Sequence, residues 1–257
     1  MADADAVRGA GLIDPVPTGG APAAPEHAMT LVDHLSELRT RLVRAILAVV
    51  VGSAIGFWLA PTIRRILAAP LPAEHRVLQV LGPGDAFAVT LRIAVVFGII
   101  LAMPVLLYQL WAFIAPGLTI SERKALRPWI PLALFFFALG VAVAWIILPF
   151  AIGFLLAFTD ETLVANLTAP AYFDFVTTMF LAFGLLMEFP IVLYGLARVG
   201  ILSSARLSAS RRISVLAIAV FAAVATPGGD LISPLVLGGT MYILFELTIF
   251  AIRRGGR

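Results

Sequence analysis

Two acidic residues stand in short polar segments that border long apolar stretches. Glu122 lies in a loop containing Pro and Gly, and Arg123 follows it directly. Glu37 lies just before the first apolar stretch, four residues ahead of Arg41. A carboxylate makes charge-assisted, often bidentate hydrogen bonds with a guanidinium group, a geometry that lysine does not reproduce. Each of these acids could therefore bind a guanidinium group.

The same spacing also allows a simpler interpretation. Glu37 and Arg41 are one helical turn apart, and Glu122 precedes Arg123 and Arg127, so each acid has a basic neighbour within reach. Ion pairs of this kind are common on protein surfaces and contribute only about 0–1 kcal/mol. On spacing alone, local ion pairs and a receptor site for guanidinium groups both stay open.

A third acid, Glu188, lies inside an apolar run that also contains Pro190. A carboxylate in a membrane costs about 2.5–3.5 kcal/mol on insertion scales, so it should face protein or water. Pro190 lacks a backbone N–H and its ring clashes with the carbonyl of Leu186, which predicts a kink beside the acid. Glu188 is thus either a hydrogen-bonded or protonated link between two helices, or part of a wet or partner-facing cavity.

Two further charged residues fall in or near apolar runs. Arg92 follows Asp85 by seven residues on the same helix face, and we expect it to form a structural ion pair. Glu246 is expected to reach the membrane surface or to pair with Arg253.

Composition identifies an integral membrane protein. Hydrophobic residues make up 61% of the 257 residues and charged residues only 13%, which excludes an ordinary soluble domain. The chain has no cysteine, and its three histidines lie outside the apolar runs. We therefore expect no disulfide, no metal site, no cofactor and no enzymatic nucleophile, and the charge pattern gives no sign of nucleic-acid binding.

The apolar runs predict six transmembrane helices and no strands, because a lipid-exposed backbone must satisfy its own hydrogen bonds. The predicted spans cover residues 42–60, 86–110, 129–149, 173–194, 213–225 and 231–252. Residues 1–28 read as a disordered tail rich in Ala and Pro, residues 29–254 as the membrane domain, and residues 255–257 as a short second tail.

The basic residues predict the orientation. Fourteen of the 18 lysines and arginines fall on the side that holds both termini, while Arg64, Arg65 and Arg76 fall on the other side and Arg92 lies inside the second span. The positive-inside rule then places both termini in the cytoplasm. The loops on the outer side, about residues 61–85 and 150–172, are expected to contain short helices and turns that together cap this face.

The last two predicted spans look short. The fifth has about 13 residues and would reach only about 20 Å, and the sixth carries Pro234 and the pair Gly238-Gly239. A short helix can stand nearly upright in the membrane while its flanking arginines extend to the surface. Alternatively, a pair of short helices can thin the bilayer locally, and the sequence leaves both possibilities open.

Several of these segments, in this order, resemble the TatC family, the receptor of the twin-arginine protein translocase. The similarity covers residues 29–254, and the segments that carry it are residues 34–41, the Pro70 region, residues 111–124, Glu188-Phe189-Pro190, Thr226-Pro227 and Tyr242 to Glu246. It implies export of folded proteins across the bacterial plasma membrane without the Sec pathway, driven by proton-motive force.

The resemblance also implies particular residues and partners. The signal peptide with its twin arginines would bind at the cytoplasmic face, and single-span TatA/TatB-like subunits would be recruited along spans five and six, with self-association of the receptor. The implied signal-peptide residues are Glu37, Arg39, Phe113, Glu122 and Arg123; Glu188 and Pro190 would lie in a concave polar face within the membrane; Pro70 and Asp230 would be outer-face residues.

The chain departs from the usual TatC pattern at three places between residues 228 and 240. Gly228-Gly229 precedes Asp230 where the family typically has Pro-Asp, Pro234 replaces a typical Gln, and Thr240 replaces a typical Pro. The outer turn and the start of span six are therefore expected to be shaped differently.

Two other functions were weighed against this one. A small-solute secondary transporter with Glu188 as its coupling carboxylate would need internal repeats with matching helix breaks, and the Pro104 and Pro190 breaks have no such counterpart. An intramembrane enzyme would need a nucleophile and a base in the spans, which the sequence does not offer.

Overall fold

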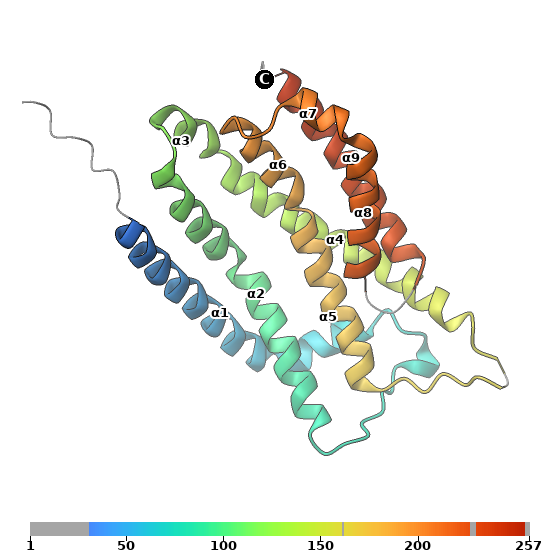
Figure 1. The fold of residues 1–257 in the computed structure, drawn as a ribbon. Coiled ribbons are helices and arrows are strands. Elements are labelled where there is room, and N and C mark those ends of the chain that lie inside the picture. The colour runs from blue at the N-terminus through green and yellow to red at the C-terminus, as the bar shows by residue number, and fades with distance from the viewer. Residues whose placement is uncertain (1–30, 161, 227–229, 255–257) are drawn as a thin grey trace, which may run out of the picture. The chain divides into compact units, whose positions relative to one another are not determined.

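The computed structural model describes residues 31–160, 162–226 and 230–254 (Figure 1). The chain divides into two units, residues 1–36 and 37–257. The described part of the first unit is the first turns of a helix, where the Ser36 hydroxyl donates to the carbonyl of Asp33 at 2.7 Å. The tails predicted for residues 1–28 and 255–257 lie outside the described residues and stay predictions.

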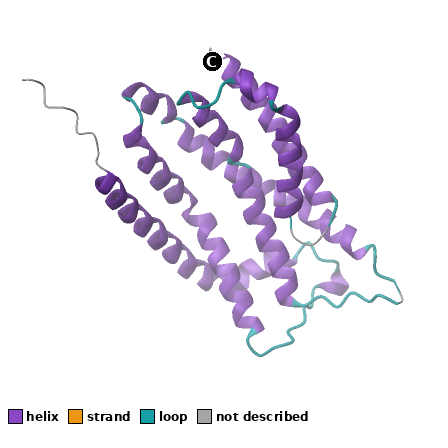
Figure 2. Ribbon diagram, viewed as in Figure 1, coloured by secondary structure: helices purple, strands orange, loops and turns teal. Residues whose placement is uncertain are grey.

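The described residues are mostly helical, as predicted, and their only β-type pairing is a single bridge between Gln79 and Thr168 (Figure 2). The α-helices are α1 (Leu31–Ala68), α2 (Asp85–Ile114), α3 (Ile120–Leu126), α4 (Trp129–Leu156), α5 (Ala169–Leu186), α6 (Phe189–Arg198), α7 (Ser204–Ala209), α8 (Arg211–Ala225) and α9 (Ile232–Arg254); two 3₁₀ turns cover Ala73–His75 and Ala115–Gly117.

Five helical segments of the described chain are long and apolar enough to cross a membrane, so the protein is a multi-pass membrane protein. They are Val32–Ala68, Asp85–Gly117, Trp129–Leu156, Ala169–Arg198 and Ile232–Arg254. Helix α8 corresponds to the predicted fifth span, and with 15 residues it is about 22 Å long. It is short, as predicted, while its crossing of the membrane stays a prediction.

Two predicted features of the helices were wrong. The sixth span was expected to be short, but α9 runs without a break for 23 residues. Pro234 is only its third residue, where a backbone N–H has no helical partner to lose. The first outer loop was expected to begin at Pro61, but α1 continues through this proline to Ala68, as transmembrane helices often tolerate.

The predicted break beside Glu188 is confirmed. Helix α5 ends at Leu186, and α6 begins at Phe189 with Pro190 as its second residue. The amides of Ile191 and Val192 both donate to the carbonyl of Glu188, at 3.0 and 3.1 Å. The proline therefore restarts the helix, and the acid occupies the position just before its first turn.

Helices α4 and α5 meet at glycines. A methyl group added to Gly140 would lie 2.4 Å from the carbonyl oxygen of Phe183, and one added to Gly184 would lie 2.6 Å from the ring of Phe137. Both phenylalanines are almost fully buried. Small residues that let two backbones approach are the usual basis of helix packing in lipid, where no hydrophobic force drives helices together.

Helices α1 and α2 pack in the same way. Methyl groups added to Gly52 and Gly56 would each lie 2.6 Å from a carbonyl oxygen of α2, those of Gly98 and Ala94. The two glycines are four residues apart, as are their partners, so one face of each helix carries the close contact over one full turn.

The two long loops at one end of these helices are joined by backbone hydrogen bonds. The amide of Gln79 donates to the carbonyl of Leu167 at 3.0 Å, and the amide of Ala169 donates to the carbonyl of Gln79 at 2.7 Å. The hydroxyl of Tyr172 donates to the carbonyl of Leu67 at 2.7 Å. The loops thus pair with each other, and the start of α5 contacts the end of α1. We call this end of the molecule the loop end.

The second long loop also contains the predicted turn at Asp160. Helix α4 continues to Leu156 as expected, and the Asp160 carboxylate then accepts hydrogen bonds from the amide and hydroxyl of Thr162, at 2.7 and 2.6 Å. These bonds hold the pKa of the Asp160 carboxyl below its ordinary value. Glu161, the other residue of the predicted turn, lies outside the described residues.

Gly140→Ala should lower the melting temperature of the purified protein in detergent by several degrees, because the added methyl group meets the backbone of α5 and overpacking costs about 1–3 kcal/mol. Gly153→Ala on the same helix is the matched control, since its methyl group would meet nothing within 4 Å. Equal melting temperatures for the two variants would contradict the close approach of α4 and α5.

Candidate functional site

Glu37 is held on α1 by its neighbour and connected to α2. Arg41 donates from Nε to the Glu37 carboxylate at 2.8 Å, and its Nη2 contacts the same oxygen. The Nη1 of Arg41 reaches the side-chain oxygen of Gln109 on α2 at 3.5 Å. The predicted local pair between Glu37 and Arg41 is confirmed, and both side chains are about four-fifths buried. Gln109 was not foreseen, since no local pattern relates residues 68 positions apart.

Glu122 is held by a capping box at the start of α3. Its carboxylate accepts from the amide of Thr119 at 2.9 Å and from the Thr119 hydroxyl at 2.8 Å, while its own amide donates to that hydroxyl at 3.4 Å. The pattern Thr-x-x-Glu is the sequence signature of this motif, so Thr119 could have been found from the sequence. The cap fixes the backbone around Glu122 and the orientation of its carboxylate.

The two acids lie near the same end of α2. Gln109, which contacts Arg41, is five residues before the end of α2 at Ile114, and a 3₁₀ turn then leads directly to Thr119 and Glu122. We call this end of the molecule the α3 end (Figure 1). Of the other predicted site residues, Phe113 is partly buried in the last turn of α2, whereas Arg39 and Arg123 are exposed.

Trp111, beside these residues, has an unusual environment. Its indole Nε1 is buried and makes no hydrogen bond within the part of the chain that the structure describes. An unpartnered buried donor carries a cost of about 1–3 kcal/mol. This environment could not be predicted, because the sequence does not show which face of α2 is covered.

Glu188, between α5 and α6, is half-buried next to the fully buried Met187. Its Oε1 is enclosed and makes no hydrogen bond to any described residue. One of the expectations for Glu188 is that it links two helices through a hydrogen bond. Within residues 31–160, 162–226 and 230–254, Oε1 of Glu188 has no partner for such a link.

The two predicted outer-face residues have different environments. Pro70 is partly buried in the turn after α1, next to the buried Leu71. Asp230 is almost fully buried, and one carboxylate oxygen accepts from the amide of Ser233 at 2.6 Å at the start of α9. Its other oxygen makes no hydrogen bond to the described residues. The expected difference in shape at Gly228-Gly229 concerns residues outside the described ones.

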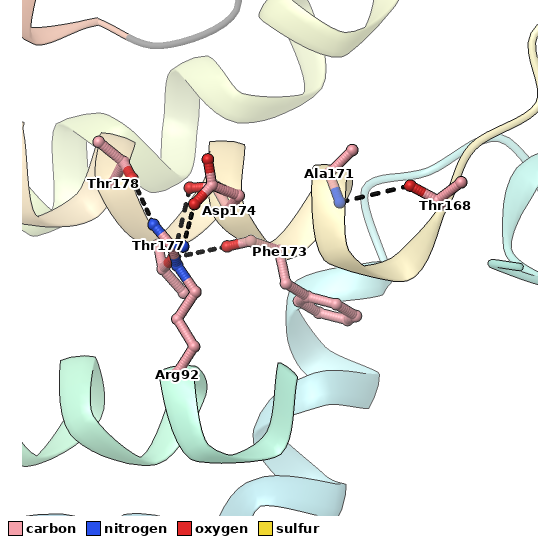
Figure 3. Close-up of polar contacts among 7 residues, drawn as sticks. All are labelled: Arg92, Thr168, Ala171, Phe173, Asp174, Thr177 and Thr178. Carbon is pink, nitrogen blue, oxygen red and sulfur yellow. Dashed lines mark hydrogen bonds and ion pairs between the residues drawn. The ribbon is translucent and has the colours of Figure 1, made fainter. Parts of the chain in front are cut away.

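Arg92 forms the expected structural ion pair, but with a different partner. The pair is with Asp174 of α5, and the guanidinium also donates to the hydroxyls of Thr177 at 2.9 Å and Thr178 at 3.0 Å (Figure 3). Asp85 instead accepts from the amides of Leu81 and Gly82 and closes the turn before α2. The prediction that Arg92 pairs with Asp85 was wrong, because spacing within one helix cannot reveal an acid 82 positions away.

Glu246 likewise has a partner other than the expected Arg253. Its carboxylate accepts from Nη2 of Arg211 on α8 at 2.7 Å, whereas Arg253 donates to the hydroxyl of Ser208 at 2.7 Å. These contacts join α7 and α8 to α9. The described residues contain no cluster of three His, Cys, Asp or Glu that could hold a metal ion.

The match to known proteins covers both acidic segments and the helix break. A family model described as Sec-independent protein translocase protein (TatC) matches residues 33–239. The chain belongs to the TatC family. It is therefore a membrane component of a protein translocase with a general role in twin-arginine translocation, and it is not an enzyme.

Individual relatives agree with this assignment. The chain is 36% identical to TatC of Carboxydothermus hydrogenoformans over 86% of its length and 92% of the relative's, and 34% identical to TatC of Aquifex aeolicus over 86% of its length and 94% of the relative's. A crystal structure of the twin-arginine translocase receptor TatC in DDM superposes with a TM-score of 0.75 at 33% identity, covering 85% of this chain and 99% of that one.

Arg92→Leu alone should lower the melting temperature more than Arg92→Leu combined with Asp174→Leu, because the single variant leaves an unpaired carboxylate against the apolar bundle. Thermal unfolding of wild type, both single variants and the double variant in detergent gives the coupling through a double-mutant cycle. Strictly additive losses would contradict a stabilising pair between α2 and α5.

Proposed function

We propose that this TatC-family protein binds twin-arginine signal peptides through the two carboxylates of the α3 end. The observation that carries the proposal is that both Glu37 and Glu122 are oriented by local contacts near one end of α2. A pair of guanidinium groups needs acceptors fixed in position, because each contact is directional. Phe113, Arg39 and Arg123 lie in the same two segments and complete the proposed site.

The side chain of Arg41 shows how the Glu37 carboxylate can hold a guanidinium group. Nε and Nη2 of Arg41 both contact one Glu37 oxygen, so this carboxylate already holds a guanidinium group, although not in the bidentate geometry that uses both oxygens. The incoming arginine would share this carboxylate with Arg41 or displace it. Glu122 differs because the contacts that orient its carboxylate come from the amide and hydroxyl of Thr119.

The proposed topology has six spans with both termini in the cytoplasm of a bacterial cell, which requires α8 to cross the plasma membrane. Support comes from the charge bias, since fourteen basic residues fall on the side of the termini. In this arrangement the α3 end faces the cytoplasm, where a signal peptide arrives, and the loop end faces outward.

TatA/TatB-like single-span subunits are proposed to dock along α8 and α9, and the receptor is proposed to associate with itself. Support comes from the large apolar side chains that these helices leave exposed, among them Ile213, Leu216 and Val224 of α8 and Leu235 of α9. A single-span helix could cover such a surface by van der Waals packing. Glu188 and Pro190 are proposed to line the polar membrane-embedded face, and Pro70 and Asp230 to shape the outer face.

Transport is proposed to be driven by the proton-motive force. The sequence has no G-x-x-x-x-G-K-[ST] segment that would bind a nucleotide. The alternative, a small-solute transporter that uses Glu188 for coupling, is not favoured, because the family match is to a protein translocase over most of the chain.

Glu122→Ala should abolish the preference for a twin-arginine signal peptide over its twin-lysine version. The measurement is photocrosslinking in membrane vesicles from positions next to Glu122 to each peptide. Wild type is expected to crosslink the arginine peptide at least about tenfold more strongly, since bidentate charge-assisted contacts contribute about 1.5–3 kcal/mol.

Glu74→Gln is the matched control for charge, because Glu74 is an exposed acid at the loop end. It should leave the preference unchanged. Equal crosslinking of both peptides to wild type, or an unchanged preference in Glu122→Ala, would refute the proposed role of this loop.

A further inference from the structure

Three arginines of the loop end line one pocket. Arg64 and Arg65 lie near the end of α1, and Arg76 follows the 3₁₀ turn Ala73–His75. All three border a cavity of about 310 Å³. They are also the three basic residues that the charge bias assigned to the outer side of the membrane. Every exception to the positive-inside pattern outside the spans therefore gathers at a single site.

The rest of the pocket is apolar. Its wall includes Val80 in the first loop, Val89 of α2 and Phe173 of α5. Phe173 is almost fully buried, whereas half of the Val80 surface is exposed. The pocket thus combines a guanidinium-rich rim with an apolar interior, which fits an amphiphile whose anionic group meets the arginines.

The described residues do not cancel the charges of these arginines by direct contact. No described carboxylate forms an ion pair with Arg64, Arg65 or Arg76, and the side-chain hydrogen bonds of Arg65 and Arg76 go to neutral oxygens. Arg76 donates to the carbonyls of Leu71 at 3.1 Å and Ala69 at 3.5 Å, and Arg65 donates to the Thr62 hydroxyl at 3.4 Å.

Arg92 provides the internal comparison. It lies only three residues beyond Val89 on α2, and there the chain supplies Asp174 and two threonine hydroxyls as partners (Figure 3). The link between α2 and α5 thus includes a carboxylate for its arginine. No described carboxylate pairs with the arginines of the pocket, so their positive charge is available to a ligand.

We propose that this pocket binds the phosphate headgroup of an anionic phospholipid, with Arg64, Arg65 and Arg76 contacting the phosphate and the wall of Val80, Val89 and Phe173 contacting the adjoining acyl chains. The lipid would belong to the outer leaflet, which rests on the proposed topology; binding itself does not depend on the orientation. Since the pocket borders the paired loops, the bound lipid would fasten the loop end to the membrane surface.

The test places a photocrosslinking amino acid at Val80 in the full-length protein, reconstituted in nanodiscs of phosphatidylcholine with a minor fraction of phosphatidylglycerol of identical acyl chains. Crosslinked lipid is identified by mass spectrometry. We expect phosphatidylglycerol to be enriched about tenfold over its share of the bilayer, and Arg64→Gln with Arg65→Gln to bring it back close to that share. Arg76 is left in place because its backbone contacts support the turn.

Two further variants separate charge from folding. Arg64→Lys with Arg65→Lys keeps both charges and should retain most of the enrichment. Arg44→Gln with Arg212→Gln removes the same net charge from exposed positions outside the pocket and should leave it unchanged. An equal loss of phosphatidylglycerol enrichment in the double lysine and double glutamine variants of the pocket would refute a site based on charge. An equal loss in the variant with Arg44→Gln and Arg212→Gln would refute it as well.

The source of the anion is tested by competition. Inorganic phosphate or glycerol phosphate, added in millimolar excess before irradiation, should not lower the yield of crosslinked lipid, because neither has acyl chains for the apolar wall. Complete loss of the crosslink would reassign the pocket to a free phosphate and overturn the lipid proposal. Equal crosslinking of phosphatidylglycerol and phosphatidylcholine in proportion to their abundance would overturn it as well.

Discussion

The cost of a lone charge in hydrocarbon governs how this chain is built. Inside the helical segments, the cation of Arg92 is matched by Asp174 and two hydroxyls from a neighbouring helix. Elsewhere the charges collect at the two ends of the bundle, where water and headgroups can solvate them. Because charged side chains cost free energy in the hydrocarbon region between the two ends of the bundle, we expect the binding sites of this protein at those ends. Glu188 is the exception.

The same solvent explains how the helices are held together. In lipid, apolar burial gives little driving force, so close backbone contact must replace it. Gly140 and Gly184 bring α4 against α5, and Gly52 and Gly56 bring α1 against α2. These contacts fix α2 and α5, and through them the segments with Glu37, Glu122 and Glu188. The acids are therefore positioned by glycines that carry no functional group of their own.

Much of the fold follows from the sequence because the membrane restricts it so strongly. The five long apolar segments, the break at Pro190 and the pair of Glu37 with Arg41 all depend on local spacing, and each was predicted. Partners from distant segments were not: Gln109 for Arg41, Asp174 for Arg92 and Arg211 for Glu246 depend on helix packing. The length of α9 was misjudged because a proline in the first turn resembles a helix breaker in sequence but is harmless there.

The proposed orientation places the loop that carries Glu122 in the cytoplasm and the paired loops of the loop end outside. The chain contains no cysteine, so a single cysteine can be introduced at Ser121 or at Ala73, both exposed, and labelled in intact cells with a membrane-impermeant maleimide. We expect labelling at Ala73 in intact cells, and labelling at Ser121 only after the membrane is opened. Labelling of Ser121 from outside intact cells would overturn the proposed orientation.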